Sequence, residues 1–145
     1  MFEREVVHRF RAAGIQAERG YHQARSGAEA PDVVVPGLWV ECGCGASVQP
    51  EKKLAQAVRD ERVLFEKAHG MGGMGGKVYP VAVTRRLGSR ELVATMMGSH
   101  LFEMMSAVLH GGWTNLLFVA PVVSMQLDSF LVLIAKPWLD WRNKP

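Results

Sequence analysis

Apolar side chains recur along this chain at two spacings, and each spacing predicts a type of element. In three segments an apolar residue recurs every three or four positions, which is typical of an amphipathic helix. These expected helices cover residues 2–13, 50–69 and 99–110. Gly14, Gly70 and Gly111 follow the three segments directly and are placed to end them.

Shorter runs rich in β-branched residues lie between the helical segments and predict strands. These runs are residues 15–22, 31–36, 38–42, 78–84 and 91–96. Residues 36–37 (Pro-Gly) are expected to join the second and third runs as a hairpin, and residues 87–89 (Leu-Gly-Ser) to turn between the last two. Because helices and strands alternate, the expected fold class is α/β, a mixed β-sheet flanked by helices.

The C-terminal part of the chain is more apolar than the rest. Residues 116–135 are almost continuously apolar, interrupted by Pro121, Gln126 and Asp128. These three residues would be costly in lipid, so we expect no membrane insertion but two buried strands, or a strand followed by a helix, bent at residues 126–128. We therefore expect a domain at residues 1–110 and an extension at residues 111–145, which packs on that domain or at a dimer interface.

Composition narrows the classes of function only slightly. The length of 145 residues and the apolar share of 48% suffice for a core without disulfides. The net charge of +3 fits a polyanionic partner such as nucleic acid without establishing one. Cys42 and Cys44 are too close for a structural disulfide, and the scattered histidines do not predict a zinc site. No signal peptide is visible, so a cytoplasmic location is expected.

Three acidic residues are placed so that they could meet. Glu3 shares a helical face with Val7 and Phe10, Asp32 opens a β-branched strand, and Glu41 ends the next strand. Carboxylates from two paired strands and a packed helix can converge on a hard divalent cation, Mg²⁺ or its substitute Mn²⁺. Each has an ordinary alternative: a helix N-terminal charge, a turn residue and a strand-end carboxylate. The functional interpretation depends on their joint arrangement.

These residues resemble a known family. The helix carrying Glu3, the loop at Ser26-Gly27, the pair Pro31-Asp32 and the run Trp39 to Gly43 are similar to the archaeal and phage Holliday junction resolvases, members of the PD-(D/E)xK, restriction-endonuclease-like superfamily. The resemblance covers about residues 1–105. It implies a Mg²⁺-dependent endodeoxyribonuclease that acts as a homodimer on a four-way DNA junction, with no membrane partner. It also implies that Glu3, Asp32 and Glu41 are metal ligands and that Ser26 lies near the scissile phosphate.

One residue departs from the motif. Gly43 stands where the family has a lysine, and glycine supplies neither charge nor donor. The lysine's role could have moved to Lys52 or Lys53 on the second helix. Alternatively, the chain is an inactive or engineered variant, or a pseudonuclease that binds junction DNA without cutting it.

Two further alternatives stay open: another repair or restriction nuclease of the superfamily, and an interaction protein whose apolar tail docks to another subunit or to a membrane. Candidate DNA contacts come from basic side chains that could attract phosphates. For those of the second helix a solvated face is the more ordinary interpretation, and for Arg85 and Arg86 an exposed turn is equally ordinary. These candidates are Arg4, Arg25, Lys52, Lys53, Arg59, Arg62, Arg85 and Arg86.

Overall fold

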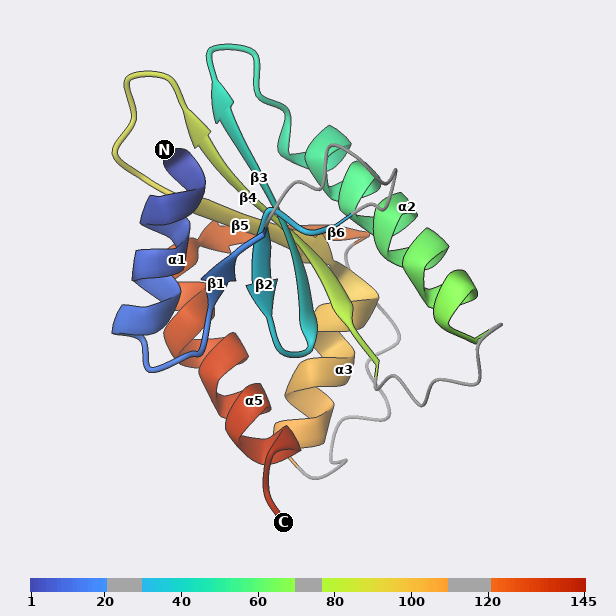
Figure 1. Ribbon diagram of the computed structural model, residues 1–145. Coiled ribbons are helices and arrows are strands. Elements are labelled where there is room, and N and C mark those ends of the chain that lie inside the picture. The colour runs from blue at the N-terminus through green and yellow to red at the C-terminus, as the bar shows by residue number, and fades with distance from the viewer. Residues whose placement is uncertain (21–29, 70–76, 110–120) are drawn as a thin grey trace.

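The computed structural model describes residues 1–20, 30–69, 77–109 and 121–145 (Figure 1). Its strands are β1 (Glu18–Arg19), β2 (Val33–Val35), β3 (Leu38–Gly45), β4 (Tyr79–Arg86), β5 (Val93–Met97) and β6 (Val122–Gln126). Its helices are α1 (Phe2–Ala12), α2 (Pro50–His69), α3 (Gly98–Val108), α4 (Leu127–Phe130), the π-helical turn η1 (Leu131–Ala135) and α5 (Lys136–Arg142).

The six strands form one mixed sheet in the order β1-β2-β3-β4-β5-β6. Only β3 and β4 run parallel, and α2 makes the crossover between them; every other neighbouring pair is antiparallel. The expected α/β class with a mixed sheet flanked by helices is therefore confirmed.

The two faces of the sheet are covered by different helices. Alternate residues of β3 point to opposite faces, and Val40 and Cys42 join the main core with Val6 and Phe10 of α1. Residues of α3, η1 and α5 complete that core, while α2 covers the other face, on which Leu54 is buried. Figure 1 shows α1 and α5 on one side of the sheet and α2 on the other.

The first strand is shorter than the expected run at residues 15–22. Only β1 (Glu18–Arg19) pairs with β2, and residues 21–22 lie outside the described part of the chain. Gly20 follows at once, and its N–H donates to the Asp32 carbonyl at 2.8 Å. A Cβ at Gly20 would stand 1.8 Å from the Pro31 carbonyl oxygen, so the close approach requires glycine here.

Other expected strands shift by one to three residues. β3 continues to Gly45 and β4 to Arg86 because the parallel ladder between them extends to these two residues. β5 begins at Val93, two residues later than expected. The expected turns at residues 36–37 and 87–89 are present, and both Gly37 and Gly88 have positive φ.

The apolar tail divides as one of the two expected forms, a strand followed by a helix. β6 pairs with β5 and ends at Gln126, and α4 begins at Leu127. Leu127, Phe130 and Trp138 then enter the same core as α1. Nowhere in the described ranges does a helix combine the length and the apolar character that crossing a bilayer requires.

Candidate active site

Asp32 and Glu41 lie side by side at the open end of the β2–β3 hairpin. The register pairs Val33 with Val40, which places Asp32, just before β2, opposite Glu41 on β3. Both residues are buried, with exposed fractions of 8% and 4%. One oxygen of Asp32, Oδ2, accepts a hydrogen bond from the Cys42 backbone N–H at 2.8 Å, which fixes the carboxylate against β3. Two buried carboxylates on paired strands are therefore held next to each other.

Protein donors surround the Glu41 carboxylate. Trp39, two residues earlier on the same face of β3, donates from Nε1 to Oε1 at 3.0 Å. On the other side, Lys53 Nζ and Gln56 Nε2 of α2 each reach Oε2 at 3.4 Å. Lys53 also donates to Gln56 Oε1 at 3.1 Å, so the two α2 side chains hold each other in place. Lys53 is thus the cation of the site.

Gly43 leaves the space through which Lys53 passes. A Cβ built on Gly43 would lie 3.1 Å from Lys53 Cγ and 3.4 Å from Lys53 Cε, as well as 3.0 Å from Val48 Cγ2. Glycine and the helix lysine are therefore complementary: the Lys53 stem fills the volume that a side chain at position 43 would take. An ammonium stands beside Glu41 although the motif's own lysine position is glycine.

The electrostatics of the site centre on Glu41. Burial, and after it the negative charge of Asp32, raise the pKa of its carboxyl to about 7 against the opposing effects of Trp39 and Lys53. Burial, with the neighbouring carboxylates Asp32, Glu3 and Glu41, also raises the pKa of the Cys42 thiol far above its usual range. Cys42 is therefore a packed thiol rather than a nucleophile.

Glu3, on α1, makes its ion pairs with other residues. Its Oε2 lies 3.2 Å from the N-terminal amine and 4.0 Å from Arg19 Nη2, and a hydrogen bond to its own backbone N–H, with these cations, lowers its pKa. Among the described residues no group of three His, Cys, Asp or Glu side chains is placed to hold a metal ion. The physical reason is the sheet itself: α1 packs on one face, whereas Glu41 points to α2 on the other.

The other sequence candidates are spread over several elements. Lys52 lines the same hollow as Gly43 and Lys53, but its side chain is exposed. Arg59 pairs with the adjacent Asp60 at 3.6 Å, and Arg62 is exposed further along α2. Ser26 and Arg25 lie outside the described residues. Arg4 is exposed on α1.

The arginines of the β4–β5 hairpin differ from each other. Arg85 Nη1 bonds Glu5 Oε2 of α1 at 2.6 Å, and its guanidinium lies 5.0 Å from the centre of the Phe2 ring. It therefore ties the hairpin to the first helix. Arg86 is exposed.

Two residues of the site had no place in the sequence prediction. Trp39 shares the Glu41 face by simple strand alternation, which was a usable signal. Gln56 lies three positions after Lys53, so both belong to one face of α2. Neither residue carries a charge, and a search guided by carboxylates and lysines passes over both.

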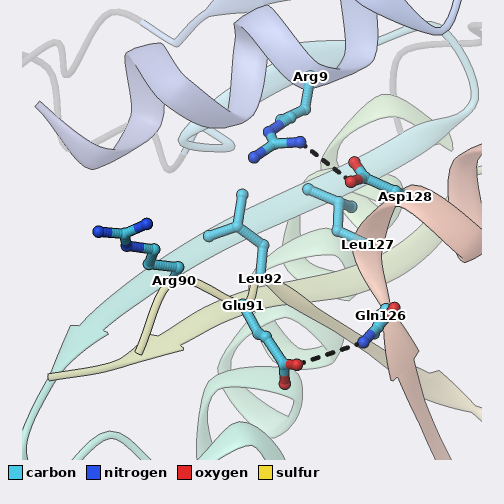
Figure 2. A pocket seen from close by; sticks show the side chains of 7 residues that line it. All are labelled: Arg9, Arg90, Glu91, Leu92, Gln126, Leu127 and Asp128. Atoms are coloured by element: carbon cyan, nitrogen blue, oxygen red, sulfur yellow. Dashed lines mark hydrogen bonds and ion pairs between the residues drawn. The ribbon is translucent and has the colours of Figure 1, made fainter. Parts of the chain in front are cut away.

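A small hollow elsewhere on the molecule serves as a comparison. It is lined in part by Arg9 of α1, Glu91 before β5 and Asp128 of α4, and Figure 2 shows their side chains. Arg9 Nη1 lies 3.0 Å from Asp128 Oδ2, and Gln126 Nε2 donates to Glu91 at 3.4 Å. The ion pair between Arg9 and Asp128 spans the hollow and joins the first helix to the C-terminal part.

The donor set of the site fits a small hard cation. Mg²⁺ is commonly held by one or two carboxylates together with waters and substrate phosphates. Asp32 and Glu41 supply two such carboxylates, and the effect of Asp32 on the pKa of Glu41 is a repulsion that a cation would relieve. These two residues could hold the metal, while Glu3 as a third ligand stays a prediction.

Mg²⁺ is expected to stabilise the protein more at pH 8 than at pH 6. Because folding raises the Glu41 pKa to about 7, the native state binds more protons than the unfolded chain between pH 4.5 and 7, and its free energy of unfolding falls as pH rises through that window. A cation needs the ionised carboxylate, so it competes with the proton. We expect millimolar Mg²⁺ to raise the unfolding temperature by roughly 3 °C at pH 8 and much less at pH 6.

Thermal unfolding followed by circular dichroism measures this difference. Glu41→Gln should remove both the fall with pH and the Mg²⁺ effect, whereas the matched change Glu91→Gln on the far hollow should keep them. Equal Mg²⁺ effects at the two pH values would contradict a site at Glu41.

No family model and no curated protein matches the chain. Among solved structures it is similar to Hjc, a Holliday junction resolvase from the archaeal hyperthermophile Archaeoglobus fulgidus, with 18% identity over 64% of this chain and 71% of that chain and a TM-score of 0.42.

Proposed function

We propose that this chain is a metal-dependent endonuclease that hydrolyses phosphodiester bonds in branched DNA. The observation that carries the proposal is the meeting of Asp32, Glu41 and Lys53, in which the Lys53 stem fills the space left by Gly43. Two carboxylates that can hold a metal ion and an ammonium that can stabilise developing charge are together a side-chain set suited to metal-assisted phosphodiester hydrolysis. Here the cation comes from the helix instead of the strand.

Each residue of the site has a chemical task in this proposal. Asp32 and Glu41 would hold Mg²⁺ or Mn²⁺, which supplies a Lewis acid for the phosphate and acidifies a bound water. Lys53 donates from a partly buried ammonium, where a charge acts more strongly than in open water, and stabilises negative charge that develops on the phosphate. Trp39 and Gln56 fix the orientation of Glu41, and Gln56 also holds Lys53.

Branched DNA and a homodimer belong to the same proposal. Their support is the resemblance of the helix at residues 2–13 and the Pro31-Asp32 and Trp39 to Gly43 segments to Holliday junction resolvases. Symmetric nicking of a four-way junction needs two active sites, which a homodimer would provide. The apolar C-terminal part contributes to the core of a single chain, so a dimer contact made through this part would use its exposed side chains, such as Val132 and Leu133.

A second candidate function has its own observation. Both oxygens of Glu41 accept hydrogen bonds from protein donors, which satisfies the carboxylate without a metal. A pseudonuclease that binds junction DNA and does not cut it would keep such a closed network. It predicts tight binding that weakens steeply with salt and no metal-dependent nicking.

A labelled four-way junction separates these two candidates. With Mg²⁺ or Mn²⁺ the protein is expected to nick the junction faster than a linear duplex of the same sequence. Asp32→Asn should lower that rate by a hundredfold or more because the change removes a charged ligand. Sequencing gels give the rate and the cut position. Binding without nicking at any metal concentration would reject the endonuclease and favour the pseudonuclease, and equal cutting of linear duplex would favour a repair or restriction nuclease.

A further inference from the structure

A basic groove lies between α1 and β1, outside the carboxylate site. It has a volume of about 470 Å³. Its lining residues are Arg4, Val7, His8, Arg11 and Arg19. Arg4, His8 and Arg11 follow one another at four- and three-residue intervals and therefore share one face of α1, while Arg19 comes from β1.

The ionisable side chains that line this groove are all basic. Three of its five lining residues are arginines, and no carboxylate is among the described residues that line it. The hollow in Figure 2 has the opposite character, because Arg9 is neutralised there by Asp128 at 3.0 Å. Clustered guanidinium groups in a concave surface attract an anion and can hold it by several charge-assisted hydrogen bonds.

The groove is held in shape by its own contacts. Arg11 Nε donates to the Ala17 carbonyl at 2.8 Å, which fixes the end of α1 against the segment leading into β1. This bond uses one of the five N–H donors of the guanidinium. Side chains positioned in this way lose less entropy when they bind a ligand.

The groove also adjoins the strand that carries Asp32. Arg19 is followed by Gly20, whose N–H donates to the Asp32 carbonyl at 2.8 Å, and Arg19 Nη2 lies 4.0 Å from Glu3. An extended polyanion in the groove could therefore reach the β1–β2 side of the sheet, next to the segment that carries Asp32. A chain of phosphodiesters has this form.

We infer that the groove of Arg4, His8, Arg11 and Arg19 binds backbone phosphates of DNA and positions the strand that enters the carboxylate site. The inference rests on the proposed function for its choice of polyanion. It concerns binding rather than chemistry, and contacts of this kind fix the register of a strand without reading its sequence.

Binding of a fluorescein-labelled junction and a linear duplex in EDTA, where no metal-dependent cutting occurs, tests the groove alone. For Arg4→Gln/Arg19→Gln we expect the dissociation constant to rise about tenfold or more for both DNAs, and the slope of log K against log salt to become shallower by about two. Arg4→Lys/Arg19→Lys should keep most of the slope because it keeps the charge. The matched control Lys136→Gln/Lys144→Gln, with the same loss of charge on α5 and the C-terminal end, should keep affinity and slope.

The outcomes separate this inference from the nuclease proposal. A changed slope without any nicking by the parent protein supports the groove and removes the nuclease. Nicking by the parent protein with an unchanged slope in Arg4→Gln/Arg19→Gln overturns the groove. If that variant unfolds, Arg4→Gln alone, at an exposed helix position, takes its place with an expected slope change of about one. Equal losses in the Lys136/Lys144 control would show general charge attraction and would also overturn it.

Discussion

Lys53→Met is expected to lower the rate of metal-dependent junction nicking by about a hundredfold to a thousandfold. Methionine keeps an unbranched stem in the space beside Gly43, so the change removes the ammonium with little effect on packing. The lost group lies 3.4 Å from Glu41 Oε2 and is the only lysine that the structure shows bonded to that carboxylate among the described residues. Single-turnover nicking at saturating protein measures the loss apart from binding.

A pH profile distinguishes this role from a merely structural one. The charge of Lys53 lowers the pKa of Glu41, so its removal should raise that pKa and move the acidic limb of the rate profile to higher pH. Lys52→Met is the discriminating variant, because Lys52 is the adjacent candidate and is exposed. A large loss in Lys52→Met together with normal nicking in Lys53→Met would assign the role to Lys52 instead.

Much of the fold follows from local signals in the sequence. Pro50 opens α2, the Pro36-Gly37 pair turns the hairpin, and the tail breaks from strand to helix between Gln126 and Leu127. Each of these depends on residues that are neighbours in the chain. The pairing of strands does not follow from such local signals. The parallel pairing of β3 with β4 and the pairing of β6 with β5 depend on packing between distant segments. No local pattern specifies them.

In the candidate site, too, some positions follow from local sequence signals and others depend on the tertiary structure. The short turn at Pro36-Gly37 sets the hairpin register that places Asp32 opposite Glu41, and strand alternation puts Glu41 and Gly43 on one face of β3. The position of Glu3 could not be predicted in this way, since an inward helical face does not say which face of the sheet the helix will cover. The choice between Lys52 and Lys53 depends on how α2 is rotated over β3, which only the tertiary structure fixes.

Because Gly43 and the Lys53 side chain are complementary in shape, we expect that restoring the motif lysine at position 43 alone lowers the nicking rate. Gly43→Lys places a Cβ 3.1 Å from Lys53 Cγ and 3.0 Å from Val48 Cγ2, distances at which a neighbour has to move. It also brings a second ammonium towards Glu41 while pushing the first one away. We therefore expect Gly43→Lys to nick more slowly than the parent protein, by about tenfold or more, and to unfold at a lower temperature.

Moving the lysine from position 53 to position 43 in one protein should recover nicking activity that each single change loses. Lys53→Ala removes the stem that crowds position 43, and in Gly43→Lys/Lys53→Ala the new lysine can extend along the same face of β3 towards Glu41. A double-mutant cycle over the nicking rates measures the coupling: the exchanged protein should nick faster than Lys53→Ala by about tenfold or more, although Gly43→Lys is harmful on its own. Val48→Ala beside Gly43→Lys is the steric control, because it relieves the other close contact and leaves both lysines. Additive losses in the cycle would mean that the two positions act separately, and the helix lysine would then not be the replacement for the one missing from the strand.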